Sequence, residues 1–175
     1  MTISDIPNLS TRLSPLPRLV LDTNVVMDLF HFRAPPLAAL AAAIAENQVI
    51  CLANDKTLAE LERVTGYPQF RLDDAARADL LHRYRQHLTV TPIPSTMSEL
   101  PPLPKCRDRD DQMFLELAQY AKADLLISRD NLVLKLARAR QRPCPFAILT
   151  PDTAMAHLFG DTDSGHPPTE HQIIL

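Results

Sequence analysis

Short apolar runs alternate with helical segments along most of the chain, and this alternation limits the possible folds more than any other feature. The runs have the length of buried strands, whereas the segments between them carry strong helix formers or capping residues. Parallel neighbouring strands need crossover connections, and helices supply them. The pattern therefore predicts an α/β fold with a central, mainly parallel sheet of five strands. Strands are expected at 19–21, 49–52, 88–93, 124–128 and 146–150, and helices at 35–47, 54–66, 73–88, 110–123, 131–141 and 151–159.

A chain of 175 residues, 46% of them hydrophobic, is long enough to bury one sizeable core. We expect a flexible N-terminal extension at 1–17, a single domain at 18–160 and a flexible C-terminal tail at 161–175. The longest apolar run, at 37–45, is too short to span a bilayer, so no membrane role is predicted.

Charge and cysteine content narrow the classes of function. The net charge of −3 argues against nucleic-acid binding by a generally basic surface, so a phosphate-handling role would need an added cation. Three widely separated cysteines fit neither a disulfide framework nor a zinc ribbon, and the six histidines show no metal-binding spacing. A reducing, cytoplasmic location is expected.

Polar side chains follow two of the predicted strands. Asp22 and Asn24 come just after the first strand, and Asp130 follows the run at 124–128. In open parallel sheets, sites form beyond the carboxyl ends of the strands. These side chains should therefore lie at one edge of the sheet.

Further acids can join this edge. Glu60 lies early in the helix predicted after the second strand, whereas Glu62 points about 200° away around the helix axis. Asp108, Asp110 and Asp111 crowd the start of the helix at 110–123, and Asp111 precedes the inward-facing Phe114 and Ala118 at helical spacing. Asp111 should thus border the buried face.

Each acid also has an ordinary structural interpretation. Asp22 and Asp130 could cap helices or stabilise turns, Glu60 could be a solvated helix residue, and the three aspartates could complement a helix dipole. Their convergence on one edge favours a site. Clustered carboxylates raise one another's pKa values unless a cation neutralises them, and an oxygen-only ligand set predicts Mg²⁺ or Mn²⁺.

The chain resembles the PIN-domain ribonucleases, in particular the branch classed as toxin components of bacterial toxin–antitoxin pairs. The resemblance runs from about Arg18 to Phe159. It rests on "LVLDTNVVMDLF", "LAELERV" followed by "YPQF", "KCRDRDDQMFLELA", and "ADLLISRDNLVL" followed by "AILTPD". It implies a PIN-like, Rossmann-like three-layer α/β/α sandwich.

Carried over by position, the family's catalytic and metal-binding acids fall on Asp22, Glu60, Asp111 and Asp130. Asp108 and Asp110 are supporting neighbours, and Asn24 matches the polar residue two positions after the first aspartate. Ser128-Arg129 departs from the Thr-Gly that this branch often carries. Arg107, Arg109 and Arg129 flank the acids and are candidates for holding the RNA backbone, although solvated arginines are the more ordinary interpretation.

The resemblance implies a metal-dependent endoribonuclease that uses one or two Mg²⁺ or Mn²⁺ ions, with RNA as substrate. It also implies a toxin role, a cognate antitoxin protein and a homodimer. Two other classes remain open from the residues. A haloacid-dehalogenase-type phosphatase would use Asp22 as a covalent nucleophile, but it would want a second acid where Asn24 stands. A non-catalytic RNA-binding or assembly module would keep the fold without turnover.

Overall fold

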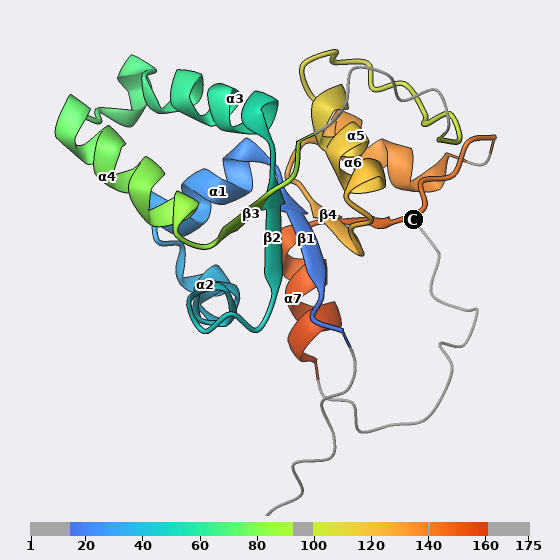
Figure 1. The fold of residues 1–175 in the computed structure, drawn as a ribbon, viewed down its shortest axis with the longest axis horizontal. Coiled ribbons are helices and arrows are strands. Elements are labelled where there is room, and N and C mark those ends of the chain that lie inside the picture. Colours follow the sequence, from blue (N-terminus) through green and yellow to red (C-terminus); the bar gives the residue numbers. More distant parts are fainter. Residues whose placement is uncertain (1–14, 93–99, 140, 161–175) are drawn as a thin grey trace, which may run out of the picture.

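The computed structural model describes residues 15–92, 100–139 and 141–160, which fold around one parallel sheet (Figure 1). The predicted flexible tail at 161–175 and most of the predicted extension at 1–17 lie outside the described residues. Every pair of neighbouring strands is parallel, which confirms the predicted fold class. The strands are β1 (Arg18–Leu21), β2 (Ile50–Ala53), β3 (Leu88–Val90), β4 (Leu125–Ile127) and β5 (Ala147–Leu149).

The helices follow the predicted segments closely, with one missed and one shortened. Asn54 forms a capping box with Thr57 at the start of the helix after β2, as its position before the helical run predicts. The predicted helix at 131–141 is too long, because the chain tightens into a 3₁₀ turn that packs on β5 and becomes extended at Ala139. The helices are α1 (Thr23–Phe30), α2 (Ala38–Ala45), α3 (Asp55–Thr65), α4 (Asp74–Arg85), α5 (Gln112–Tyr120), α6 (Asn131–Lys135) and α7 (Pro151–Phe159), with 3₁₀ turns η1 (Pro35–Leu37), η2 (Pro68–Phe70) and η3 (Leu136–Arg138).

Helix α1 was not predicted from the sequence. Val25 and Val26 are β-branched and favour strands, and the segment is short. The fold overrides this preference because Asp22 caps the helix and because Val25 and Leu29 are buried in the core. Tertiary packing therefore decides the structure of this segment.

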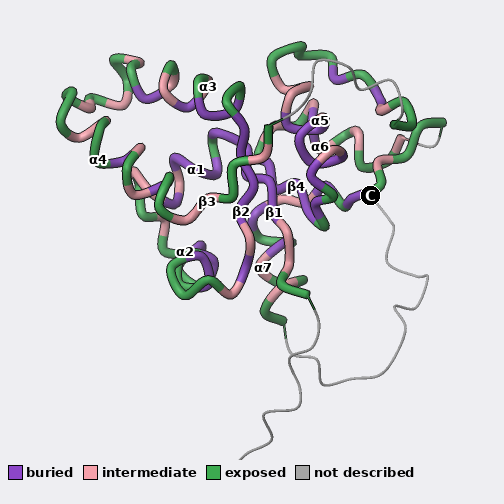
Figure 2. Tube along the Cα trace, viewed as in Figure 1, coloured by how far each residue is buried: buried purple, intermediate pink, exposed green. Residues whose placement is uncertain are grey.

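Two apolar clusters cover the two faces of the sheet. Leu19 and Leu21 of β1 join a cluster with α1, α2, α3, α4 and α7, whereas Val20 joins a cluster with α5 and α6. This alternation follows from the two-residue period of a strand. Figure 2 shows β1, β2 and β4 buried between the helical layers, whereas the edge strand β3 is largely exposed; this arrangement is the expected three-layer sandwich.

Among the described helices, none is long and apolar enough to cross a membrane by itself. Helix α1 and the η1–α2 segment together have the length and apolar composition of a membrane span, but the two are bent by 99° relative to each other.

The strand order β3-β2-β1-β4-β5 places the first strand at the centre of the sheet. The chain builds outward from β1 through β2 to β3, and then returns to the other side of β1 with β4. The order thus reverses between β1 and β4. In parallel sheets of this type, the crevice outside the carboxyl ends at the reversal point is where ligands bind.

Candidate active site

Asp22 begins the site at the carboxyl end of β1. Leu21 pairs with Ile127 across the sheet, and the N–H of Asp22 donates to the carbonyl of Ile127 at 3.0 Å. The Asp22 carboxylate is almost fully buried, and its Oδ1 accepts the backbone N–H of Asn24 at 3.1 Å. Asp22 is therefore both the cap of α1 and an acid fixed at the reversal point.

Ser128 links Asp22 to the second strand end. This serine is fully buried, and its hydroxyl donates to Oδ2 of Asp22 at 2.5 Å. The same Oγ accepts the backbone N–H of Asp130 at 2.9 Å. One side chain thus couples the residues that follow β1 and β4.

Asp130 caps α6. Its Oδ1 accepts the backbone N–H groups of Leu132 at 2.6 Å and Val133 at 3.2 Å. These bonds fix the orientation of the carboxylate from one oxygen. The structural interpretation of Asp130 as a cap is therefore correct, and it is compatible with a site because the residue still stands at the sheet edge beside Ser128.

Asp111 differs from these two acids because it makes no side-chain capping bond at the start of α5. It is partly buried, as its position before Phe114 and Ala118 predicts, and both of those residues are buried. Asp108 and Asp110 are exposed, and Oδ1 of Asp108 accepts the N–H of Asp110 at 3.0 Å. Only Asp111 of the three borders the interior.

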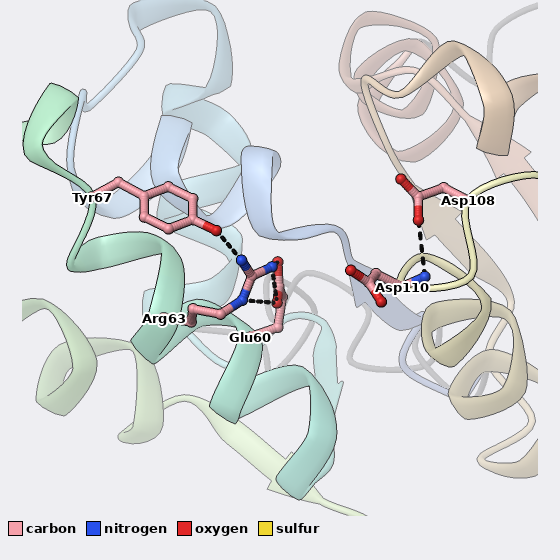
Figure 3. Close-up of polar contacts among 5 residues, drawn as sticks. All are labelled: Glu60, Arg63, Tyr67, Asp108 and Asp110. Carbon is pink, nitrogen blue, oxygen red and sulfur yellow. Dashed lines mark hydrogen bonds and ion pairs between the residues drawn. The ribbon is translucent and has the colours of Figure 1, made fainter.

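Glu60 projects from α3 and is held by Arg63, one helical turn further on (Figure 3). The Arg63 Nη2 lies 2.8 Å from Oε1 and 2.7 Å from Oε2 of Glu60, and its Nε lies 2.9 Å from Oε2. The Arg63 guanidinium also bonds the hydroxyl of Tyr67 and lies over the ring of that tyrosine. Both oxygens of Glu60 are consequently engaged.

Glu60, Arg63 and Asp110 line one small hollow of about 280 Å³, between α3 and the start of α5. In Figure 3, Asp110 lies across from the Glu60–Arg63 pair. Hydrogen bonding and proximity to Glu60 raise the pKa of the Arg63 guanidinium, and Asp110 adds to this effect. The charge of Arg63 on α3 is therefore coupled to that of Asp110 in the segment before α5.

Electrostatic coupling joins the acids predicted from the sequence. Burial raises the pKa of Asp22, the bonds from Ser128 and Asn24 oppose the rise, and the charges of Asp130 and Glu60 add to it. Burial together with the carboxylates of Asp22 and Asp130 raises the pKa of Asp111 to about 7, and Asp108 and Asp110 contribute further. Asp22, Asp111 and Asp130 thus share a region of negative charge that no ion pair within the described residues neutralises.

This donor set fits a hard divalent cation in its chemistry. Every donor is a carboxylate oxygen, and a positive charge would oppose both the burial and the repulsion that raise the pKa values of Asp22 and Asp111. As their side chains are placed, no three acidic, histidine or cysteine residues in the described ranges are grouped tightly enough to hold a metal ion. The pairing of Glu60 with Arg63 turns that carboxylate to a neighbour on its own helix instead.

The remaining predicted site residues lie around this edge. Asn24 is exposed and contributes its backbone N–H to Asp22. Arg129 is exposed and forms an ion pair with Asp28 of α1, whereas Arg107 and Arg109 are exposed in the segment before α5.

Sequence reasoning missed three participants. Ser128 was noted only as a departure from the family pattern, although a hydroxyl immediately after a strand and two residues before an acid is a detectable signal. The partnership of Arg63 with Glu60 follows from i,i+3 helical spacing. The partnership of Asp28 with Arg129 joins distant segments, and no local pattern indicates it.

A parallel α/β domain with electrostatically coupled carboxylates at its reversal point has acids where sheets of this type bind ligands. The family model of the PIN domain matches residues 18–132, which is more than half of the chain and includes all four principal acids. The chain therefore belongs to the PIN-domain family, and this membership indicates a nuclease. No curated protein matched the sequence.

Proposed function

We propose that this protein is a metal-dependent endoribonuclease that hydrolyses RNA phosphodiester bonds with Asp22, Glu60, Asp111 and Asp130 as its catalytic acids. The observation that carries the proposal is the coupling of Asp22, Asp111 and Asp130 at the reversal point of a PIN-domain sheet. Family membership favours this reading over the haloacid-dehalogenase-type phosphatase.

The proposed cofactor is one or two Mg²⁺ or Mn²⁺ ions, held by the four principal acids. A bound ion of this kind activates water, stabilises the leaving oxygen and neutralises the carboxylates. Asp108 and Asp110 add negative charge beside Asp111 and are supporting residues in this proposal.

The chain's own residues prepare the site by fixing its acids. Ser128 orients Asp22 through Oδ2, and the backbone of Asn24 holds Oδ1. The α6 backbone orients Asp130. In this proposal Glu60 joins the set by leaving Arg63, which frees the guanidinium to face a phosphate of the substrate.

Three arginines near the acids are proposed to hold the RNA backbone. Arg107 and Arg109 are exposed and take part in no ion pair within the described residues. Arg129 first has to leave Asp28, so its contribution should be the smallest of the three.

The domain is proposed to span 18–160, because β5 and α7 extend the sheet and core beyond the matched residues. We further propose a cytoplasmic toxin with a cognate antitoxin protein and a homodimeric state, on the resemblance described above. All three cysteines are free, which suits a reducing compartment. Co-purification from the native host tests the antitoxin, and sedimentation at high protein concentration tests the dimer.

The direct test of the activity is cleavage of an internally labelled single-stranded RNA by the purified chain with Mn²⁺ or Mg²⁺. The wild type should produce internal cuts, EDTA should abolish them, and Asp22→Asn should reduce the rate at least about a hundredfold. Glu46→Gln changes an exposed carboxylate at the opposite edge of the sheet and should leave the rate unchanged. Binding of RNA without any cutting would instead support the non-catalytic module.

A further inference from the structure

A larger hollow of about 810 Å³ lies beside the acidic site. Its walls come from the start of α3, the segment at 100–106, the start of α5 and the loop that contains Arg142. A volume of this size falls within the range of ligand-binding clefts in proteins. No site residue proposed above accounts for it, except Arg109 and Asp110 on its border.

Four cationic side chains, from three stretches of the chain, line this hollow. They are Lys56, Lys105, Arg109 and Arg142, and all four are exposed. Within the described residues, none of them takes part in an ion pair. The hollow also has two acids, Asp110 and Glu116, so the cations are in excess.

The hollow adjoins the smaller hollow at Glu60, one of the four proposed catalytic acids. Lys56, Asp110 and Met113 line both this hollow and the smaller one that contains Glu60 and Arg63. A chain molecule bound at Glu60 can therefore pass directly into the larger hollow. Its backbone charge would meet cations there instead of the carboxylates.

The same walls carry apolar side chains. Leu100 is exposed, and Leu103 and Met113 are partly exposed within the lining. A single strand of nucleic acid presents phosphates that bind cations and bases that pack on apolar surface. A groove that has cationic and apolar side chains next to each other therefore suits a single strand.

We propose that this hollow, the cationic groove, binds the single-stranded RNA that flanks the cleaved bond. The phosphates contact Lys56, Lys105, Arg109 and Arg142, and the bases pack on Leu100 and Leu103. The proposal rests on the proposed nuclease function, because the shared border with the hollow of Glu60 selects RNA as the occupant. An acidic peptide is the competing occupant, and the test separates the two.

The test compares two variants of the full chain that lose equal charge. The groove variant carries K56Q, K105Q, R109Q and R142Q. The control variant carries R33Q, R71Q, K122Q and K135Q, which are also exposed cations without ion pairs in the described ranges and which lie outside the groove lining. Binding of a fluorescein-labelled single-stranded RNA is followed by anisotropy in EDTA, where cutting is stopped, between about 50 and 200 mM salt.

The groove variant should bind RNA about tenfold or more weakly than the control variant. Its plot of log affinity against log salt should be flatter by about 3, because each phosphate contact on a single strand contributes about 0.7 to the slope. Equal affinities and slopes for the two variants would overturn the proposal. Loss of binding to labelled polyglutamate with RNA binding kept would also overturn it, in favour of a peptide.

Cleavage with Mn²⁺, measured on the same proteins, separates this proposal from the nuclease function. If the wild type cuts RNA and the groove variant binds RNA as well as the control variant does, the groove proposal is refuted and the nuclease proposal is supported. If the wild type does not cut RNA and only the groove variant loses RNA binding, the nuclease proposal is refuted and the groove proposal is supported.

Discussion

Replacing Ser128 by alanine should destabilise the protein through two lost hydrogen bonds. The hydroxyl is fully buried, donates to the buried Asp22 carboxylate at 2.5 Å and accepts the Asp130 N–H at 2.9 Å. A hydrogen bond to a charged group contributes about 1.5–3 kcal/mol, and a backbone donor left without a partner costs about 1 kcal/mol or more. We therefore expect Ser128→Ala to lower the free energy of unfolding by about 3 kcal/mol, or Tm by about 6–12 °C.

The loss should depend on pH with a defined sign. The Ser128 bond lowers the pKa of Asp22, so it favours the ionised carboxylate. Its stabilisation is therefore largest above the pKa of Asp22 and falls as the pH drops through that pKa. As the pH drops toward 4, the loss should shrink toward about 2 kcal/mol, because a neutral hydrogen bond contributes about 1 kcal/mol and the Asp130 N–H still loses its acceptor.

Urea denaturation in EDTA at pH 8 and pH 4 measures both quantities. Thr65→Val is the matched control, because the Thr65 hydroxyl is equally buried but donates to a neutral acceptor, the carbonyl of Glu62, at 3.0 Å. The control should lose about 1 kcal/mol at both pH values. A loss below about 0.5 kcal/mol for Ser128→Ala at pH 8 would refute the bridging role.

Two further predictions concern polar groups at the same edge of the sheet. Burial and the neighbouring carboxylates raise the pKa of Asp111 in the folded protein from 3.8 to about 7, so the metal-free fold loses stability as the pH rises from about 4 to about 7, and the loss levels off above pH 7. Asp111→Asn should therefore raise the free energy of unfolding in EDTA at pH 8 by about 1 kcal/mol, after allowance for solvent screening of this half-exposed group. At pH 4 the free energy of unfolding should change little. An equal change at both pH values would contradict the repulsion. The Thr23 hydroxyl is buried and finds no hydrogen-bond partner within the described residues, so Thr23→Val should stabilise the protein by about 1 kcal/mol in urea denaturation, and a loss of stability would show that the hydroxyl has a partner in solution.

The sheet and most helices could be predicted because their signals are local. Apolar runs of strand length marked β1 to β5, and the cap Asn54 marked the start of α3. Helix α1 could not be predicted in this way, since its valines favour strands and its stability comes from burial against α3 and α4. The end of α6 was missed for a similar reason, because packing on β5 decides it.

In the candidate site, too, some features could be predicted from the sequence and others could not. The placement of Asp22 and Asp130 at one edge followed from sheet topology, and the partial burial of Asp111 followed from helical spacing. The bridge through Ser128 depends on the register of β1 with β4, which the sequence does not reveal. The cationic groove gathers cations from three stretches of the chain, and only Arg109, which adjoins the acids in sequence, was noticed beforehand.

Binding of Mn²⁺ to the purified protein tests the central claim, that the acids at this edge act as one cation-binding set. Electron paramagnetic resonance should show that the wild type and Glu46→Gln bind the ion with equal affinity. Asp22→Asn and Asp111→Asn should each weaken binding at least about tenfold. Equal affinity in all four proteins, or no binding by the wild type, would contradict the account.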